Sequence, residues 1–349
     1  MKKCFLNHVT IFLICSALFS ACKKETPVVG IALNKDVLSL EIGNAEMLIA
    51  TIQPDNATNK NVTWMSSNPA VATVADNGLV TAISKGKATI TVVTQESNKI
   101  AMCTIFVLSP GSLRIVHWSD PQLGYKVDYQ TGLAQLRKSV QLINEISPDA
   151  LLIAGDMVHF PDSNNYINAF LNILSHVNTC VILLTPGNHD ICSPITVESL
   201  RRYRSFFGDD LQTMEMKGYS IISVNAALLL GSEEVPPEER SHHTDRVMDA
   251  LQNAKNKNQP IIIMAHHYQP YLREEHYEIR NLFVEFGTFL WISGHWHIPW
   301  RNTYYHPGGT IDILVGESTG ANDEGYPLGI RLLTVYSDNR FDWDFIPLY

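Results

Sequence analysis

The sequence has little positive charge and few cysteines, and both shortages exclude classes of protein. Its 26 Lys and Arg are outnumbered by 35 Asp and Glu, which gives a formal net charge of -9 in 349 residues. A general nucleic-acid binder would carry a basic stripe, so nucleic acid is not an expected partner. Six cysteines in a chain of this length do not form the dense disulfide framework of a small secreted domain. A P-loop and a dinucleotide-binding fingerprint are also absent.

Residues 1–21 have the features of a bacterial lipoprotein signal peptide. An apolar run at residues 9–19 follows a short cationic start, and it is shorter than the about 20 apolar residues that a membrane-spanning helix needs. Cys22 follows a Ser-Ala pair, which resembles a lipobox, in which this cysteine is lipidated and becomes the first mature residue. An ordinary signal peptide with a chance cysteine is the alternative. Lys23 after the cysteine favours an outer-membrane lipoprotein of the cell envelope.

Residues 22–27 form a polar tether, and residues 28–108 then show the pattern of an all-β domain. Short runs rich in Val and Thr alternate with turn residues such as Asn77-Gly78 and Lys85-Gly86. No stretch with helical spacing of its apolar residues interrupts them. The pattern predicts an antiparallel immunoglobulin-like β-sandwich.

Four short sequence segments within this stretch closely resemble the bacterial group 2 immunoglobulin-like domain. They are Val62-Thr63-Trp64-Met65-Ser66-Ser67-Asn68-Pro69, Val71-Ala72-Thr73-Val74, Gly78-Leu79-Val80 and Gly86-Lys87-Ala88-Thr89-Ile90. The resemblance implies that Trp64 lies in the core and that Gly78-Leu79-Val80 belongs to a hairpin. Domains of this family are more often spacers than binding modules. No site is therefore expected here, although contact with a surface glycan stays open.

Residues 109–112 have the composition of a linker, and the rhythm changes at residue 113. Apolar runs at 113–118, 150–154 and 180–184 predict buried strands, and helical spacing predicts helices that end at Ser147 and near Ser175. Alternation of strands and helices over residues 113–349 predicts an α/β layered domain.

Five short polar motifs, called the five polar words below, follow apolar runs in this second domain. They are expected at the carboxyl ends of strands, where open α/β sheets bind their ligands. They are Asp120-Pro121-Gln122, Gly155-Asp156, Gly187-Asn188-His189-Asp190, His266-His267 and Gly294-His295-Trp296-His297. A lone Gly-Asp is usually a turn, and a lone histidine after a strand is usually packed at a rim. Five such words in succession are hard to explain as packing, since buried polar groups are costly unless they coordinate or hydrogen-bond something.

These words in this order resemble the calcineurin-like metallophosphoesterases, from about Leu113 to the C-terminus. The resemblance implies a four-layer fold, in which two packed β-sheets are flanked by helices and two divalent metal ions lie at the strand ends. It also implies a role for each matching residue. The first metal would be held by Asp120, Asp156 and His297, and the second by Asp156, Asn188, His266 and His295, with Asp156 as the bridge. His189 would act beside the leaving group as an acid or transition-state stabiliser.

The residue types suit this chemistry. Two metal ions about 4 Å apart can clamp a phosphoryl group and generate a hydroxide at neutral pH. Two carboxylates and one hydroxide leave a surplus positive charge, which holds phosphate and stabilises the transition state. Mixed imidazole, amide and carboxylate ligands favour Mn, Fe, Zn or Co over Ca.

The sequence departs from the family pattern at two positions. Gln122 stands where most relatives have a histidine, so it would bind the first metal weakly or through water. His159 stands where many relatives have the acidic residue that orients the histidine equivalent to His189, and it would instead touch a metal. The same combination occurs in a branch of the family that includes a protein phosphatase, so we do not interpret it as inactivation.

Three neighbouring histidines and one aspartate are secondary candidates. His267 is expected on the opposite face of its strand from His266, at the rim or behind the ligands. Asp190 is expected to anchor its own turn, behind the ligands or among them. His242-His243 follows an acidic stretch and is expected in a solvated loop.

The sequence therefore predicts an exported, metal-dependent phosphoesterase that hydrolyses phosphomonoesters or phosphodiesters with a metal-activated hydroxide. Its partners would be a small phosphoester and, through Cys22, a membrane. The alternative is a surface adhesin with a degenerate phosphoesterase domain, which Gln122 and the immunoglobulin-like domain would favour.

Overall fold

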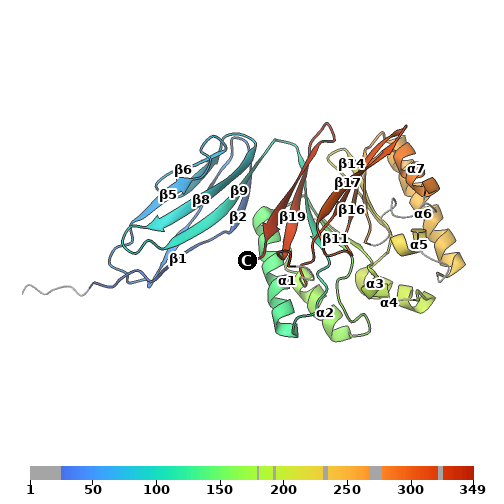
Figure 1. The fold of residues 1–349 in the computed structure, drawn as a ribbon, viewed down its shortest axis with the longest axis horizontal. Helices are drawn as coiled ribbons and strands as arrows, with labels where there is room; N and C mark the ends of the chain where they lie inside the picture. The colour runs from blue at the N-terminus through green and yellow to red at the C-terminus, as the bar shows by residue number, and fades with distance from the viewer. Residues whose placement is uncertain (1–24, 179–180, 192–193, 231–234, 267–276, 321–324) are drawn as a thin grey trace, which may run out of the picture.

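The computed structural model describes residues 25–178, 181–191, 194–230, 235–266, 277–320 and 325–349 (Figure 1). Cys22 and His267 lie outside these ranges, so the predictions made for them have no structural counterpart. The described residues form two domains side by side, a β-domain at the N-terminal side and a larger domain of strands and helices. No helix in these ranges is long and apolar enough to cross a membrane.

The first domain is an all-β sandwich, as predicted. Its strands are β1 (Gly30–Leu33), β2 (Val37–Glu41), β3 (Ala45–Met47), β4 (Ala50–Gln53), β5 (Val62–Ser66), β6 (Ala72–Val74), β7 (Leu79–Ala82), β8 (Gly86–Thr94) and β9 (Ile100–Leu108). They form sheets in the orders β2-β9-β8-β5, β3-β7-β6 and β1-β4. The prediction of a wholly antiparallel sandwich was wrong at one pair, because β2 runs parallel to β9.

Alternating side chains build the core of this sandwich. In β8, Ala88, Ile90 and Val92 are buried and alternate with partly exposed residues, which is the period of a strand with one solvated face. Trp64 packs against the same cluster of apolar side chains. The turn before β7 needs glycine, because Gly78 has a φ of +89° and an added Cβ would lie 2.3 Å from the Leu48 carbonyl oxygen.

Two sheets make the centre of the second domain. Their strands are β10 (Leu113–Ser119), β11 (Ala150–Ala154), β12 (Val181–Thr185), β13 (Gln212–Met216), β14 (Tyr219–Ser223), β15 (Ile261–Met264), β16 (Thr288–Ser293), β17 (Trp300–His306), β18 (Gly309–Val315), β19 (Gly329–Val335) and β20 (Phe341–Pro347). One sheet has the order β12-β11-β10-β19-β20 and the other β13-β14-β15-β16-β18-β17. Neighbouring strands β10, β11 and β12 are parallel, as are β14, β15 and β16, so their carboxyl ends share one edge in each sheet.

Helices flank the two sheets (Figure 1). They are α1 (Tyr129–Ile146), α2 (Asn164–Leu174), α3 (Asn188–Ile191), α4 (Val197–Phe207), α5 (Ala226–Leu230), α6 (Pro237–Asn256) and α7 (Tyr277–Glu285). Helix α1 begins where the Asp128 carboxylate accepts the backbone N–H groups of Gln130 and Thr131, and it ends at Ser147 in the left-handed conformation.

Three apolar layers hold the domain together. Leu136, Ile143 and other residues of α1 pack with α2 and α4 on one sheet, and Val247 and Leu251 of α6 pack on the other. Between the sheets, side chains such as Ile115, Leu152 and Ile262 are fully buried. The order helices, sheet, sheet, helices is the predicted four-layer fold, and it fixes both strand-end edges relative to each other.

The two domains share a packed interface. Val37, Phe106 and Leu108 of the sandwich belong to the same apolar cluster as the residues of α1. At its edge, the Glu145 carboxylate accepts the backbone N–H groups of Asp36 and Val37, at 2.8 and 2.9 Å. The sandwich is therefore docked directly on α1.

One local prediction was wrong. His242 and His243 lie in helix α6 and not in a loop. His242 is exposed, whereas His243 is buried and its Nε2 atom accepts the backbone N–H of Asn225 at 3.2 Å.

Candidate functional site

The carboxyl ends of five strands, three in one sheet and two in the other, meet at one place. Asp120 follows β10, Asp156 follows β11 and Asn188 follows β12, all in the first sheet. His266 follows β15, and both His295 and His297 follow β16, in the second sheet. Since the two sheets are packed face to face, six predicted ligands from distant parts of the chain approach one another.

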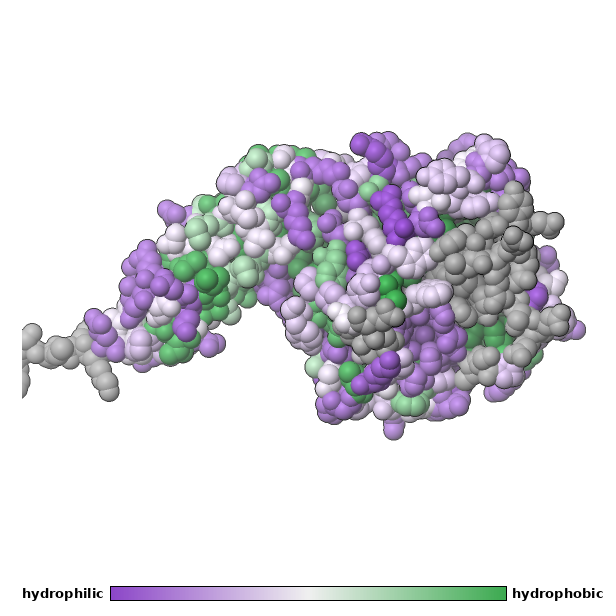
Figure 2. Space-filling model, in the orientation of Figure 1, coloured by the Kyte–Doolittle hydropathy of each residue, from purple (hydrophilic) through white to green (hydrophobic). Residues whose placement is uncertain are grey.

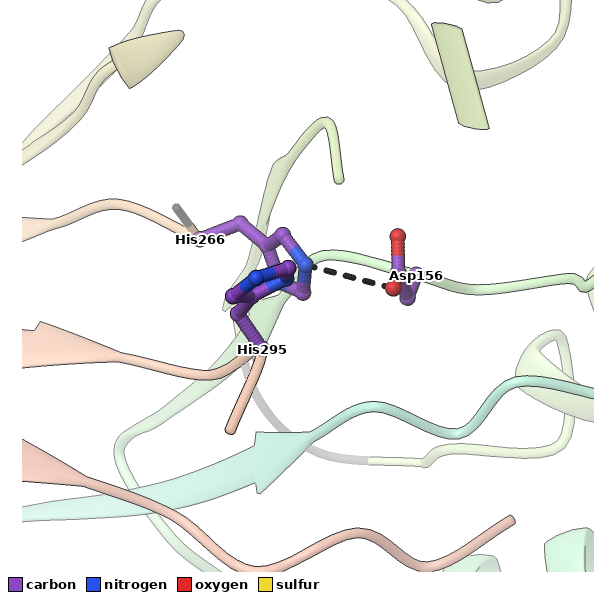
Figure 3. Close-up of side chains that lie close together, drawn as sticks. All are labelled: Asp156, His266 and His295. Atoms are coloured by element: carbon purple, nitrogen blue, oxygen red, sulfur yellow. Dashed lines mark ion pairs between the residues drawn. The ribbon is translucent and has the colours of Figure 1, made fainter. Parts of the chain in front are cut away.

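Asp156, His266 and His295 form the centre of this site (Figure 3). One ligand atom from each of them lies within 4.8 Å of the others. Nε2 of His266 is 3.2 Å from Oδ2 of Asp156, and Nδ1 of His266 is 2.6 Å from the Ala154 carbonyl oxygen. The backbone contact fixes which ring nitrogen faces the carboxylate, as is usual for a metal-binding histidine.

Asp120 and Asn188 lie beside this centre. The Asp120 carboxylate accepts the backbone N–H of His295 at 3.0 Å, and its Oδ1 atom is 3.5 Å from Nε2 of His297. Oδ1 of Asn188 is 2.9 Å from Nδ1 of His295. Five of the predicted ligands, Asp120, Asp156, Asn188, His266 and His295, thus form one continuous network, and His297 joins it through Asp120.

The backbone of the site is strained. Asp120, Gln122, Asp156, His295 and His297 have φ values of 45°, 34°, 48°, 77° and 57°, in the left-handed region that non-glycine residues rarely adopt. Such strain persists only where surrounding structure imposes it, and it is concentrated at functional sites. The positive φ values at His295 and His297 bend the chain after β16, so that both rings reach the two aspartates.

Close packing around the carboxylates leaves room only for glycine at two positions. An added Cβ at Gly187 would lie 2.0 Å from Oδ1 of Asp156, and one at Gly294 would lie 2.5 Å from Oδ2 of Asp120. The glycines of the words Gly187-Asn188-His189 and Gly294-His295 therefore serve the site by letting the backbone approach its carboxylates.

Gln122, at the position where most relatives have a histidine, lies at the site beside Asp156. The residue is buried, its Nε2 atom is 3.5 Å from Oδ2 of Asp156, and its Oε1 atom has no hydrogen-bond partner among the described residues. An unpaired buried amide oxygen costs about 1–3 kcal/mol. This oxygen is available to a cation or to water.

His159 and His189 stack on each other. Their ring centroids are 4.6 Å apart at 35°, and burial together with His189 lowers the pKa of His159. The His189 backbone N–H donates to Oδ1 of Asp156 at 2.8 Å, which ties this residue to the centre. His159 does not belong to the described metal-binding cluster, so its geometry favours support of His189 by stacking.

Asp190 has a structural role that extends beyond its own turn. Oδ2 accepts the backbone N–H of Gly187 at 2.8 Å, and Oδ1 accepts that of Met157 at 3.0 Å. It thereby joins the loops that carry Asp156 and Asn188. Burial and the nearby Asp156 raise the pKa of Asp190 to about 8.

The segment Gly316-Glu317-Ser318-Thr319-Gly320 fits the spacing of a serine-hydrolase elbow, but the structure gives it another role. Ser318 is buried, and its hydroxyl donates to the Asp120 carbonyl oxygen at 2.9 Å. The Thr319 hydroxyl accepts the indole N–H of Trp118 at 2.7 Å. A nucleophilic serine would be exposed at the top of a strand, whereas Ser318 supports the Asp120 loop from below.

Tyr125 was missed in the sequence, although it comes only three residues after Gln122. Its ring centroid lies 5.0 Å from that of His159, 6.4 Å from that of His189 and 5.5 Å from that of His297. The short distance along the chain was the only available signal. The segment that contains Ser318 stood out in the sequence only as a possible border of the pocket, and nothing in it indicated the contact with Asp120.

The two carboxylates at the centre are held in the charged form that a cation site requires. Burial alone would raise the pKa values of Asp120 and Asp156, but His266 and other nearby groups hold both below the usual range. Burial alone would lower the pKa of His266, and the two carboxylates raise it to about 10. The two carboxylates therefore attract positive charge to this centre, which is what a bound divalent ion would supply.

The donor set fits divalent metal ions. It combines two carboxylates, three imidazoles and two amide side chains, of which five residues have positive φ, and the Gln122 amide oxygen has no other partner among the described residues. Metal ions of the Mn, Fe, Zn and Co group accept such mixtures. A packed core would not leave these charged and polar groups together without a ligand.

Comparison with known proteins identifies a family for each of the two domains. Residues 27–105 match the bacterial Ig-like domain (group 2) family, and residues 113–299 match the calcineurin-like phosphoesterase family. Serine/threonine-protein phosphatase CPPED1 of Bos taurus is 22% identical over 261 residues, which cover 65% of this chain and 82% of the bovine protein.

Other similarities are partial. An uncharacterised protein of Clostridium acetobutylicum is 39% identical over 80 residues, or 23% of this chain, and the match spans only 20% of the clostridial protein's length. Among solved structures, purple acid phosphatase PPD1 from yellow lupin (Lupinus luteus) has a TM-score of 0.48 at 13% identity. That alignment covers 88% of this chain and 66% of the lupin protein.

Proposed function

Because the chain belongs to the calcineurin-like phosphoesterase family, whose members are phosphoric ester hydrolases, we propose that it hydrolyses small phosphomonoesters or phosphodiesters with two bound divalent metal ions. The observation that carries this proposal is the cluster of Asp156, His266 and His295, whose ligand atoms lie within 4.8 Å of one another. A bacterial Ig-like domain of group 2 precedes the phosphoesterase domain.

The ligand sets are those that the family resemblance implies, and the network around the cluster supports them. Asp156, Asn188, His266 and His295 would hold one metal ion, and Asp120, Asp156, His297 and the amide oxygen of Gln122 would hold the other. When bound, the ions supply a Lewis acid and a hydroxide at neutral pH. Mn, Fe, Zn and Co all suit this mixture of nitrogen and oxygen ligands.

The protein's own groups would bind and orient the phosphoester. Two carboxylates, Asp120 and Asp156, leave a surplus positive charge at a centre with two divalent ions, which attracts the phosphoryl oxygens. The His189 imidazole would donate a proton to the leaving-group oxygen. Its backbone bond to Asp156 and its stacking on His159 hold it in place for that transfer.

Metal content and phosphate release of matched variants test the proposal. Asp156→Asn and His295→Ala should each lower metal content and reduce turnover of p-nitrophenyl phosphate by more than about 100-fold, because even the outer partners of metal ligands contribute about 10–100-fold. His242→Ala, at an exposed position on α6, is the control. Equal activity of metal-free and metal-loaded protein would reject the proposal, and absence of both metal and turnover would favour the binding-module alternative.

We also propose that the chain is exported and lipid-anchored at Cys22 in the cell envelope. Support comes from the sequence of residues 1–22, which lie outside the described residues. Labelling of the wild-type chain by a radioactive fatty acid in a bacterial host, with no label on Cys22→Ser, is the expected result. Labelling of both proteins would reject the anchor site.

A further inference from the structure

A row of aromatic rings begins at the candidate metal centre and leads away from it. The ring of Tyr125 lies between those of His297 and His159, and the Phe160 ring is 4.7 Å from that of His159. Beyond it come Tyr166, at 5.3 Å from Phe160, and Tyr129, at 5.0 Å from Tyr166. We call Tyr125, His159, Phe160, Tyr166 and Tyr129 the aromatic row.

The aromatic row packs on the core at Tyr129 and Tyr166 and is exposed at Phe160. Tyr129 and Tyr166 pack against the apolar core under α1 and α2, which holds the row rigid. Phe160 is 46% exposed, although its ring contacts those of His159 and Tyr166. Gly124 allows the close approach of Phe160 and Tyr166, because an added Cβ there would lie 2.6 Å from Tyr166 and 3.2 Å from Phe160.

A second exposed ring lies at the centre. Trp296 stands between two metal-ligand candidates in the chain, its ring centroid is 6.3 Å from that of His295, and it is 48% exposed. Exposed single aromatic residues need no explanation. Here, however, exposed rings occur on two different loops that both adjoin the cluster of Asp156, His266 and His295.

The position of the aromatic row relative to His189 indicates which part of a substrate it would contact. Tyr125 and His159 both lie against the His189 ring, and His189 is the residue that would face the leaving-group oxygen. A leaving group that extends from the phosphorus past His189 would therefore lie along Tyr125 and Phe160. Aromatic faces at such a place favour planar rings, through offset or edge-to-face contacts.

We propose that the aromatic row binds the leaving group, and that the substrates of this site are phosphoesters whose alcohol carries a planar aromatic ring. This inference rests on the proposed phosphoesterase function. Aliphatic alcohols would gain contact area but not the geometry of ring-to-ring contact. Packing alone would account for Tyr129 and Tyr166, but it does not account for the exposure of Phe160.

Equilibrium binding of phosphonates tests the proposal without turnover. Manganese-loaded protein is titrated calorimetrically with ethylphosphonate, 2-phenylethylphosphonate and 2-cyclohexylethylphosphonate, which share one metal-binding group. The phenyl compound should bind about tenfold more tightly than ethylphosphonate, and clearly more tightly than the cyclohexyl compound. Phe160→Leu and Tyr125→Leu should each remove most of this preference.

Tyr305→Leu is the matched control, because Tyr305 is 77% exposed near the hairpin end of β17, away from the strand ends that form the site. Equal affinities for the phenyl and ethyl compounds, or for the phenyl and cyclohexyl compounds, would overturn the proposal. So would a phenyl preference that survives both variants. Hydrolysis of p-nitrophenyl phosphate by the same preparation separates the two claims. Hydrolysis without a ring preference rejects only the role of the aromatic row, and a ring preference without hydrolysis rejects only the proposed phosphoesterase.

Discussion

Nε2 of His266 lies 3.2 Å from Oδ2 of Asp156, although the two residues follow strands of different sheets. The contact joins the strand-end edges of both sheets at one point, and both side chains are buried. Burying an ion pair is costly unless its geometry and further partners compensate. A metal ion bound by both side chains would offset this cost.

Gly187→Ala should disable the site without touching a ligand. The new Cβ would lie 2.0 Å from Oδ1 of Asp156, so the carboxylate or the turn must move. We expect a loss of metal content and turnover, together with a loss of stability of about 1–3 kcal/mol from the steric conflict. Elemental analysis, phosphate release and urea unfolding would measure these effects.

Gly30→Ala is the control for that substitution, because its Cβ would make only ordinary contacts at 3.7 Å or more. Normal metal content in Gly187→Ala would show that Asp156 is not held where the structure places it.

Ser318→Ala should weaken the enzyme but not abolish it. The hydroxyl donates to the Asp120 carbonyl oxygen, so its loss should cost about 1 kcal/mol of stability and lower the affinity for metal. Turnover of p-nitrophenyl phosphate should remain measurable and recover as manganese is raised. A loss as complete as in Asp156→Asn, with no recovery, would indicate that Ser318 is a nucleophile.

His243 should make the fold sensitive to acid. Burial lowers the pKa of His243 to about 4, despite the opposing charge of Asp210. In the unfolded chain the His243 imidazole binds a proton near pH 6.5, whereas in the folded chain it stays neutral until about pH 4. The stability contributed by neutral His243 is therefore lost as pH falls from about 6.5 towards 4. Between pH 7 and pH 5 the loss should be about 2 kcal/mol.

His243→Gln keeps an acceptor for the Asn225 backbone N–H and should lose that part of the pH dependence in urea unfolding. His242→Gln, one residue away and exposed, should retain it. The same pH dependence in both variants would contradict the assignment to His243.

Glu145→Ala should loosen the contact between the two domains. Its carboxylate accepts two backbone N–H groups of the sandwich, at 2.8 and 2.9 Å, at a partly exposed edge. We expect a destabilisation of about 1–2 kcal/mol, less than for a buried charged acceptor. Glu198→Ala, whose side chain is 76% exposed in α4, is the control. Equal unfolding midpoints for the two variants would show that the Glu145 contact adds nothing.

The five polar words and an α/β layered domain could be predicted because both depend on local pattern, whereas the four-layer order came from the resemblance to the calcineurin-like phosphoesterases. Asp120, Asp156 and Asn188 each follow a buried strand, and parallel neighbours bring their carboxyl ends to one edge. The same reasoning located His266 and His295. The strained φ values at these turns were not predictable, since they are imposed by the surrounding packing.

Contacts that depend on the pairing of distant segments could not be predicted. Ser318 reaches Asp120 because Ser318 pairs with Ser119 across an isolated bridge. The burial of His243 depends on how α6 packs beside Asn225. The acidic stretch that precedes His243 in the sequence did not indicate this burial. Residue spacing likewise did not reveal that Phe160 and Tyr166 would continue a row of rings from Tyr125.

The most direct test of the central claim is the metal content of the purified full chain, measured together with hydrolysis of p-nitrophenyl phosphate and its bis ester. We predict bound divalent metal, turnover that a chelator abolishes and manganese restores, and loss of both in Asp156→Asn. Undiminished turnover in the chelated protein, or in Asp156→Asn, would contradict the account.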